Sequence, residues 1–116
     1  MSYSSPHINT MFMAARQAGK KLVRDFGEVE NLQVSIKGVS DFVSAADIQS
    51  EKILINELSR AYPDYDILAE EAGFIKNSKT NSGMKWIIDP LDGTTNFLFG
   101  IPHFAICIAL QSKEEI

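Results

Sequence analysis

Four carboxylates in this sequence lie at or just beyond the ends of predicted strands. Glu70 and Glu71 follow the apolar segment YDILA, and Asp89 and Asp92 follow the apolar segment KWII. Side chains at the ends of neighbouring strands can converge on one point, and converging like charges are costly unless a cation lies between them. Carboxylate oxygens without a histidine or cysteine nearby in sequence favour Mg²⁺ or Mn²⁺ over zinc. The pattern therefore predicts a site for a hard divalent cation.

The string DPLDGT, which starts at Asp89, has the residue types of a sharp turn beside a ligand. Pro90 fixes the backbone after the first aspartate, and Gly93 permits a tight turn and a close approach to the main chain. If residues 94–98 (TTNFL) begin a helix, its first N–H groups face the same place and would attract a phosphate. Taken singly, Asp92 also fits a helix cap and Asp89 a turn residue.

The elements that must position these residues are predicted from hydrophobic periodicity. A first helix is expected near the N-terminus, an interpretation favoured over a transit peptide for the acid-free segment 1–24. A second helix is expected over residues 45–61, with Ser44 and Asp47 as a capping box. Strands are expected over residues 32–38, 65–71, 85–89 and 104–110, the last of them buried on both faces, with a turn after it. The apolar stripes would be Ile8, Met11, Phe12, Ala15, Leu22 and Val29 in the first helix, and Ile48, Ile55, Leu58 and Tyr62 in the second.

Composition restricts the class of protein. The chain has 116 residues, 45% hydrophobic and 22% charged, which fits one globular domain. A formal net charge of −4 without a basic run disfavours direct nucleic-acid binding, and no apolar run is long enough for a membrane span. Cys107 is the single cysteine, which fits a reducing compartment such as the cytoplasm. His7 is expected to be solvated before the first helix and His103 to be packed or hydrogen-bonded, so neither is expected to bind metal.

The string WIIDPLDGTTNFLFGIPHFAICIAL, from Trp86 onward, resembles the signature of the inositol monophosphatase family, W-x-[IV]-D-P-[IL]-D-G-T-x-N-F. The resemblance extends upstream to AEEAG and SDFVSAADIQSEKIL. It implies an α+β fold, a layered α/β sandwich in which residues 1–116 are the N-terminal portion, with two long helices packed on a mainly antiparallel sheet. It also implies a lithium-sensitive phosphomonoesterase, usually a homodimer, that uses two or three Mg²⁺ ions, for which Mn²⁺ can substitute.

The resemblance also assigns roles to individual residues. Those that resemble the family's metal ligands are Glu70, Asp89, Asp92 and the carbonyl of Leu91. Thr94 resembles the residue that orients the attacking water together with Glu70, and Asp47 resembles the acid that supports Thr94. The amides of Gly93 and Thr94 resemble a phosphate cradle. Two further candidates are Glu71, beside Glu70, and Lys37, which lies near a basic position of a family loop.

The substrate expectation rests on Thr95. Branches of the superfamily that act on bisphosphates commonly have a lysine at this place, so the string DGTTNF resembles the monophosphatase branch and implies inositol monophosphate or a similar polyol phosphate. A bisphosphate nucleotidase and a non-catalytic regulatory or scaffold protein of the same fold are the alternatives. The chain stops where a return strand would begin, so we expect a longer protein whose C-terminal half supplies a third metal-binding aspartate. Activity of these 116 residues by themselves is not expected.

Overall fold

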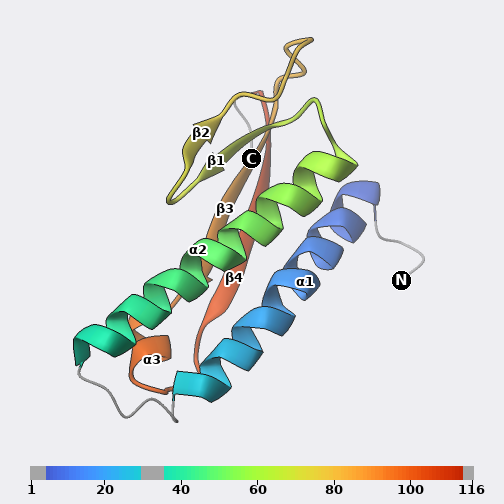
Figure 1. Ribbon diagram of the computed structural model, residues 1–116. Coiled ribbons are helices and arrows are strands. Elements are labelled where there is room, and N and C mark those ends of the chain that lie inside the picture. Colours follow the sequence, from blue (N-terminus) through green and yellow to red (C-terminus); the bar gives the residue numbers. More distant parts are fainter. Residues whose placement is uncertain (1–4, 30–35, 114–116) are drawn as a thin grey trace.

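Two long helices cover one face of a four-stranded sheet in the computed structural model, which describes residues 5–29 and 36–113 (Figure 1). Helices α1 and α2 run antiparallel, side by side. The elements are α1 (Pro6–Val29), α2 (Ile36–Ala61), β1 (Asp66–Ala69), β2 (Gly73–Ile75), β3 (Met84–Asp92), α3 (Thr94–Leu98) and β4 (Ala105–Ser112). The fold is α+β, which confirms the class predicted from the sequence.

The sheet brings the ends of β1 and β3 together. Its strand order is β2-β1-β3-β4, with β1 parallel to β3 and the two outer pairings antiparallel. Two of three pairings are therefore antiparallel, as the prediction of a mainly antiparallel sheet requires. Because parallel strands end at the same edge, the register Ala69↔Ile88 leaves Glu70 and Asp89 as the next residues along neighbouring strands.

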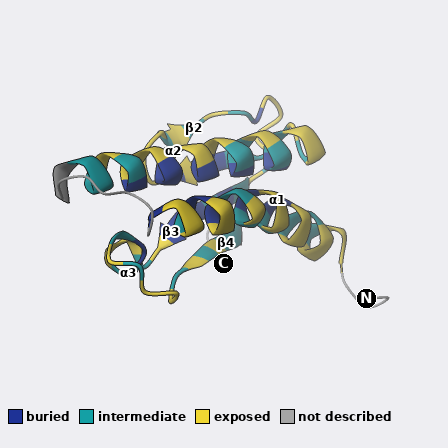
Figure 2. Cartoon of the chain, turned by 60° about the horizontal axis from the view of Figure 1, so that its bottom comes forward, coloured by how far each residue is buried: buried dark blue, intermediate teal, exposed yellow. Residues whose placement is uncertain are grey.

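The main core lies between the helices and the inner face of the sheet. Ala14 and Ala18 are fully buried on α1, and such small side chains let the helix approach its neighbours closely. Large side chains from α2 and β3 fill the space, and each fully buried Leu contributes roughly 1.5–3 kcal/mol. The cluster contains Ala14, Ala18, Leu54, Leu58, Ile67, Ala69, Trp86 and Ile88. Figure 2 shows the buried residues on the sides of α1 and α2 that face this core.

A second cluster anchors α3 at the end of the sheet where the carboxylates lie. Phe97 is fully buried, and its ring contacts Phe26 of α1 and Phe104 at centroid distances of 5.5 and 4.9 Å. Edge-to-face contacts of this kind stabilise aromatic groups beyond their burial. The short helix is thus stabilised by packing against α1 and α2, because a helix of five residues is not stable by itself.

The long helices differ from the prediction in their buried faces. Ile8 and Phe12 of α1 are more than half exposed, because α1 packs through a stripe of smaller residues. The α1 stripe is Ala14, Ala18, Leu22, Asp25 and Val29. On α2, Ile48 is 39% exposed, whereas Val43, Ala46 and Leu54 are buried. Leu22 and Val29 on α1 and Leu58 on α2 are buried as predicted. Elsewhere the close approach of the helices favours small residues such as Ala14, Ala18 and Ala46.

Helix α2 also begins nine residues earlier than predicted, at Ile36. Residues 36–38 are therefore helical, and the predicted strand over 32–38 is wrong for these three; positions 32–35 lie outside the described residues. Ser44 lies in the helix interior, so it cannot cap the helix. The reason is packing: Val39, Phe42 and Val43 contribute to the second cluster, which favours helix over the short alternating pattern.

The strands predicted after α2 largely follow the prediction, with one error of burial and one omission. Strand β2 is only three residues long and was not predicted. Strand β4 lies at the sheet edge, and Ala105 and Cys107 are exposed because both long helices cover the opposite face. The prediction that 104–110 is buried on both faces is therefore wrong for this chain. The predicted turn after β4 is described only as far as residue 113.

The prediction for His7 is wrong, whereas His103 is hydrogen-bonded through its main chain, as one of its two predicted alternatives requires. His7 lies inside α1, where its Nε2 is 2.8 Å from the Tyr65 hydroxyl and its ring contacts Trp86 edge-on. Aromatic neighbours thus replace the expected water. His103 is exposed. Within the described ranges, no helix combines the length and apolarity needed to cross a membrane.

Candidate functional site

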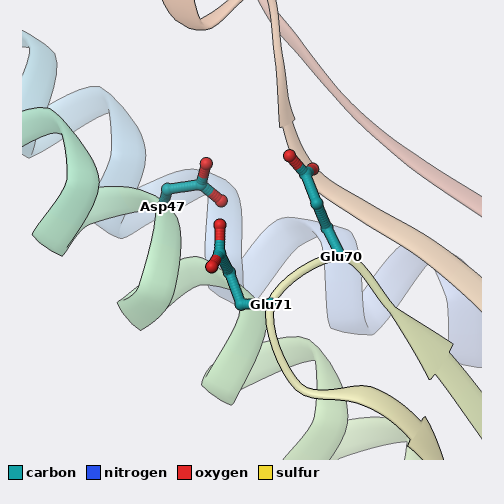
Figure 3. A group of neighbouring side chains, drawn as sticks. All are labelled: Asp47, Glu70 and Glu71. Carbon is teal, nitrogen blue, oxygen red and sulfur yellow. The ribbon is translucent and has the colours of Figure 1, made fainter.

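Three carboxylates gather where the end of β1 meets the middle of α2. Asp47 comes from α2, and Glu70 and Glu71 come from the turn that follows β1 (Figure 3). One carboxylate oxygen of each lies within 4.8 Å of those of the other two. Asp47 is buried, whereas Glu70 and Glu71 are exposed. An all-oxygen donor set, open on one side to water, fits a hard divalent cation.

Two buried polar residues of α2 hold this arrangement in place. The carboxylate of Glu51, 3% exposed, accepts hydrogen bonds from the backbone amides of Glu71 at 2.8 Å and Ala72 at 2.9 Å. The Ser50 hydroxyl donates to the carbonyl of Pro90 at 2.8 Å. One helix face therefore fixes both the turn after β1 and the end of β3.

Sequence reasoning missed Ser50 and Glu51. The available signal was that Asp47, Ser50 and Glu51 interrupt an apolar stripe of α2 at helical spacing, between Ala46 and Leu54. Polar residues on a buried helix face must find partners in the protein, because an unpaired buried polar group is costly. The predicted helix over 45–61 already contained these residues, but its buried face was assigned to Ile48, Ile55, Leu58 and Tyr62.

Asp89 and Asp92 project on the same face because of a bulge in β3. Asp89 pairs with Cys107, and Asp92 pairs with Ala105, so β3 has one more residue than β4 in this interval. Residues three apart in a regular strand point to opposite faces, but one extra residue restores the same side. The pKa of the Cys107 thiol is raised by desolvation and then by the charges of Asp92 and Asp89, consistent with this placement.

Asp92 lies apart from the group formed by Asp47, Glu70 and Glu71. It lines a hollow of about 460 Å³ to which none of those three residues contributes. The other lining residues are Gly93, Asn96, Pro102, His103, Phe104 and Ala105. Glu70 and Asp89 are close enough for their carboxyl groups to share a proton, which raises the pKa of Glu70. The structure thus joins Glu70 to Asp89 directly and leaves Asp92 exposed, one bulge further along β3.

The turn between β3 and α3 has a fixed geometry. The Thr94 hydroxyl donates to the carbonyl of Leu91 at 3.0 Å. Gly93 has φ +90°, and a Cβ there would lie 2.9 Å from the carbonyl oxygen of His103. The side-chain amide of Asn96 donates to the same carbonyl at 2.7 Å. Only glycine fits this position without strain or collision. The side chain of Lys37, the remaining predicted candidate, lies outside the described part of the chain.

The carboxylates carry more negative charge than their surroundings compensate. Burial, followed by the charges of Glu71, Asp89 and Glu51, raises the pKa of Asp47 to about 6. The pKa of Glu70 is raised to about 7, first by its hydrogen bond with Asp89, then by burial and the neighbouring charges. The Oδ1 atom of Asp47 has no hydrogen-bond partner among the described residues. A divalent cation would relieve both the repulsion and the unpaired oxygen.

The fold and site define an α+β protein with a cluster of carboxylates, able to hold a cation, at the end of two parallel strands. The model of the inositol monophosphatase family matches residues 4–116, and the chain belongs to that family.

Individual relatives agree with this assignment. An inositol-1-monophosphatase of Rhizobium meliloti (strain 1021) is 56% identical over 109 residues, which are 94% of this chain and 40% of that protein. A Nus factor SuhB of Xylella fastidiosa (strain Temecula1) is 46% identical over 110 residues, 95% of this chain and 38% of the relative. The crystal structure of the extragenic suppressor protein suhB of Bartonella henselae superposes with a TM-score of 0.79 at 55% identity, and the match covers 95% of this chain and 42% of that one. The chain therefore spans about two fifths of the length of these relatives.

Proposed function

We propose that residues 1–116 are the N-terminal, metal-binding portion of a Mg²⁺-dependent phosphomonoesterase. The observation that carries the proposal is the convergence of Asp47, Glu70 and Glu71, with Asp89 near enough to raise the pKa of Glu70, in a chain of the inositol monophosphatase family. Glu70, Asp89, Asp92 and the Leu91 carbonyl would hold the cations. Bound Mg²⁺ would supply Lewis-acid chemistry, favouring ionisation of a water and withdrawing charge from phosphate oxygens.

The protein's own groups would orient the reactants. Glu70 is exposed at the edge of the cluster, so its carboxylate can accept a hydrogen bond from an attacking water and fix its direction. Thr94, whose hydroxyl donates to Leu91, keeps an acceptor lone pair free for the same water. Asp47, buried behind them, would act as a positioning residue. The amides of Gly93 and Thr94 would receive the phosphate oxygens beside the hollow that Asp92 lines.

The proposed substrate is inositol monophosphate or a similar polyol phosphate. Thr95 is exposed and adds no charge next to the hollow, so the described residues offer no cation there for a second phosphate. Asn96 and Phe97 of the same string have structural roles. The Asn96 side chain donates a hydrogen bond to the carbonyl of residue 103, and Phe97 is buried in the core. Homodimer formation, lithium sensitivity and a cytoplasmic location stay predictions of the family resemblance.

A chimera tests this function at the full length of a relative. The 109 aligned residues of this chain replace their counterparts in the Rhizobium meliloti protein, and phosphate release from myo-inositol 1-phosphate is measured with and without Mg²⁺. Activity close to that of the parent relative, lost on chelation and reduced at least ~100-fold by Asp89→Asn, is expected. Asp41→Asn, an exposed acid on α2, is the matched control. A chimera that folds like the parent but releases no phosphate would refute the proposal.

The relatives called Nus factor SuhB favour one second candidate, a scaffold that works by binding other proteins. The two functions make opposite demands on the carboxylates. A scaffold should retain its partners in Asp89→Asn and lose them on changes at exposed apolar positions such as Phe99, which is 66% exposed. The test measures which proteins are captured by the unchanged chain, by Asp89→Asn and by Phe99→Ser. Loss of partners in Phe99→Ser alone would support the scaffold function.

A further inference from the structure

We propose that Ser50 is a positioning residue for the reaction proposed above, and that its hydroxyl sets the direction of the Asp89 carboxylate. The link between the two side chains is the peptide unit that joins Pro90 to Leu91. The inference rests on the proposed function, because it concerns how the chain prepares one of the residues that would hold the cations. It gives a functional role to a buried residue of α2 that the family resemblance does not single out.

The peptide between Pro90 and Leu91 is not held by the sheet. The register joins β3 to β4 at Asp89 and again at Asp92, and within the described residues the two positions between them have no register partner on β1 or β4. A bulge of this kind interrupts the ladder of backbone hydrogen bonds. The Pro90 ring fixes φ of its own residue, but ψ of Pro90 and φ of Leu91 still allow the peptide plane to turn. Another group must therefore fix its direction.

Ser50 supplies this group. Its side chain is 1% exposed, and its hydroxyl donates to the Pro90 carbonyl at 2.8 Å. The peptide bond that follows is trans, so the Leu91 N–H points away from the Pro90 carbonyl. On that opposite side, the Leu91 amide donates to Oδ1 of Asp89 at 3.3 Å. One planar unit thus connects the Ser50 hydroxyl to the Asp89 carboxylate.

The hydrogen bond to Asp89 depends on this support. A separation of 3.3 Å is just beyond the usual range for N–H···O bonds, so this bond alone would hold the carboxylate weakly. With the peptide plane fixed by Ser50, the Leu91 amide stays directed at Oδ1, and Oδ2 is left for a cation. Removal of a group that orients a metal ligand commonly weakens metal binding roughly 10–100-fold. Loss of the Ser50 hydroxyl should therefore weaken cation binding although every ligand is still present.

Two variants that differ only in the hydroxyl test the proposal. Ser50→Thr keeps the donor, whereas Ser50→Val has nearly the same shape without it. Ile67→Val, which removes one buried methyl group from the main core, controls for a general loss of stability. All are made in the chimera described above. Hydrogen exchange of the Leu91 amide is followed by NMR in metal-free protein, and Mn²⁺ affinity is measured by electron paramagnetic resonance.

We expect Ser50→Val to speed exchange at Leu91 at least tenfold relative to the amide of Ile88, and to weaken Mn²⁺ binding about tenfold. Ser50→Ala should act like Ser50→Val, whereas Ser50→Thr and Ile67→Val should change both quantities less than twofold. A purely structural role would not separate the valine from the threonine variant in this way.

Three results would overturn the proposal: equal behaviour of Ser50→Thr and Ser50→Val, an unchanged Mn²⁺ affinity in Ser50→Ala, or a parent chimera that binds no Mn²⁺. A parent chimera that binds Mn²⁺ but releases no phosphate would instead refute the proposed function. The exchange and Mn²⁺ measurements would then still decide whether Ser50 directs the Asp89 carboxylate.

Discussion

Replacing Gly93 with alanine should destabilise the chain more than any other glycine-to-alanine change at a left-handed position. The residue has φ +90°, and a left-handed backbone costs a non-glycine residue roughly 1–2 kcal/mol. The new Cβ would also lie 2.9 Å from the His103 carbonyl oxygen and 3.2 Å from the Cα of Phe104. Both are backbone atoms that cannot rotate away, and forced overpacking of this kind costs about 1–3 kcal/mol. The expected total is about 2–5 kcal/mol.

Gly100→Ala is the matched control. Gly100 has φ +72°, but nothing lies within 4 Å of the position that a Cβ would take, so alanine there meets only the backbone cost. Both changes reduce the entropy of the unfolded chain equally, so that effect cancels in the comparison. Urea unfolding followed by circular dichroism gives both free energies, with the slope m as a check that the unfolded states are alike. We expect Gly93→Ala to lose at least about 1 kcal/mol more than Gly100→Ala.

Equal losses at the two glycines would refute this reasoning. They would show that residues 103–104 move freely away from the turn, so that the close approach at Gly93 constrains nothing. The hollow beside Asp92 gives a second readout, because Gly93 also lines it. If the collision is real, Gly93→Ala should displace the main chain there and weaken phosphate binding, whereas Gly100→Ala should not.

The remaining predictions concern α2. In metal-free buffer, Asp47→Asn should stabilise the chain at pH 7.5 by on the order of 2 kcal/mol and have little effect at pH 4, because the folded-state pKa of about 6 lies above the ordinary 3.8. A raised carboxyl pKa means that stability is fully present below pH 3.8 and is lost as the pH rises through 6; a gain that is equal at both pH values in urea unfolding would contradict this. Ser50→Ala should cost about 1–3 kcal/mol, since the buried carbonyl of Pro90 loses its donor, while Ser44→Ala at an exposed position of the same helix should change the free energy of unfolding by less than about 0.5 kcal/mol. Comparable losses for the two serine variants would show that the buried hydrogen bond contributes nothing.

The strands that carry the carboxylates could be predicted from sequence because their signals are local. DILA and KWII are short apolar runs flanked by polar or turn residues, and the residues that end them are the acids themselves. The α+β class was implied by the family resemblance, and these strands and two long helical patterns agree with it. A local pattern is sufficient to predict a strand where residues close in sequence determine both its burial and its end.

The polar contacts that support the site could not be predicted in the same way. Glu51 and the amide of Glu71 are separated by 20 residues, and Ser50 and Pro90 by 40. Their pairing depends on how α2 lies across β1 and β3, which periodicity does not encode. The early start of α2 has a similar cause, since tertiary packing of residues 39–43 overrides the local preference. Local patterns thus located the carboxylates, and long-range packing determined which of them meet.

The extra residue in β3 makes this part of the molecule more sensitive to changes in length than to changes in side chain. In a strand, the face on which a residue projects depends on whether its distance from a reference position is odd or even. Removing one residue between Asp89 and Asp92 would convert the bulge into a regular ladder in which Asp92, then two residues after Asp89, keeps its face. Inserting one residue beside the bulge would instead turn Asp92 toward the helices. A conservative substitution in the same interval leaves that parity unchanged. Single-residue insertions at Pro90 and Leu91 should therefore be tolerated less well than the substitutions that a mutational scan samples there.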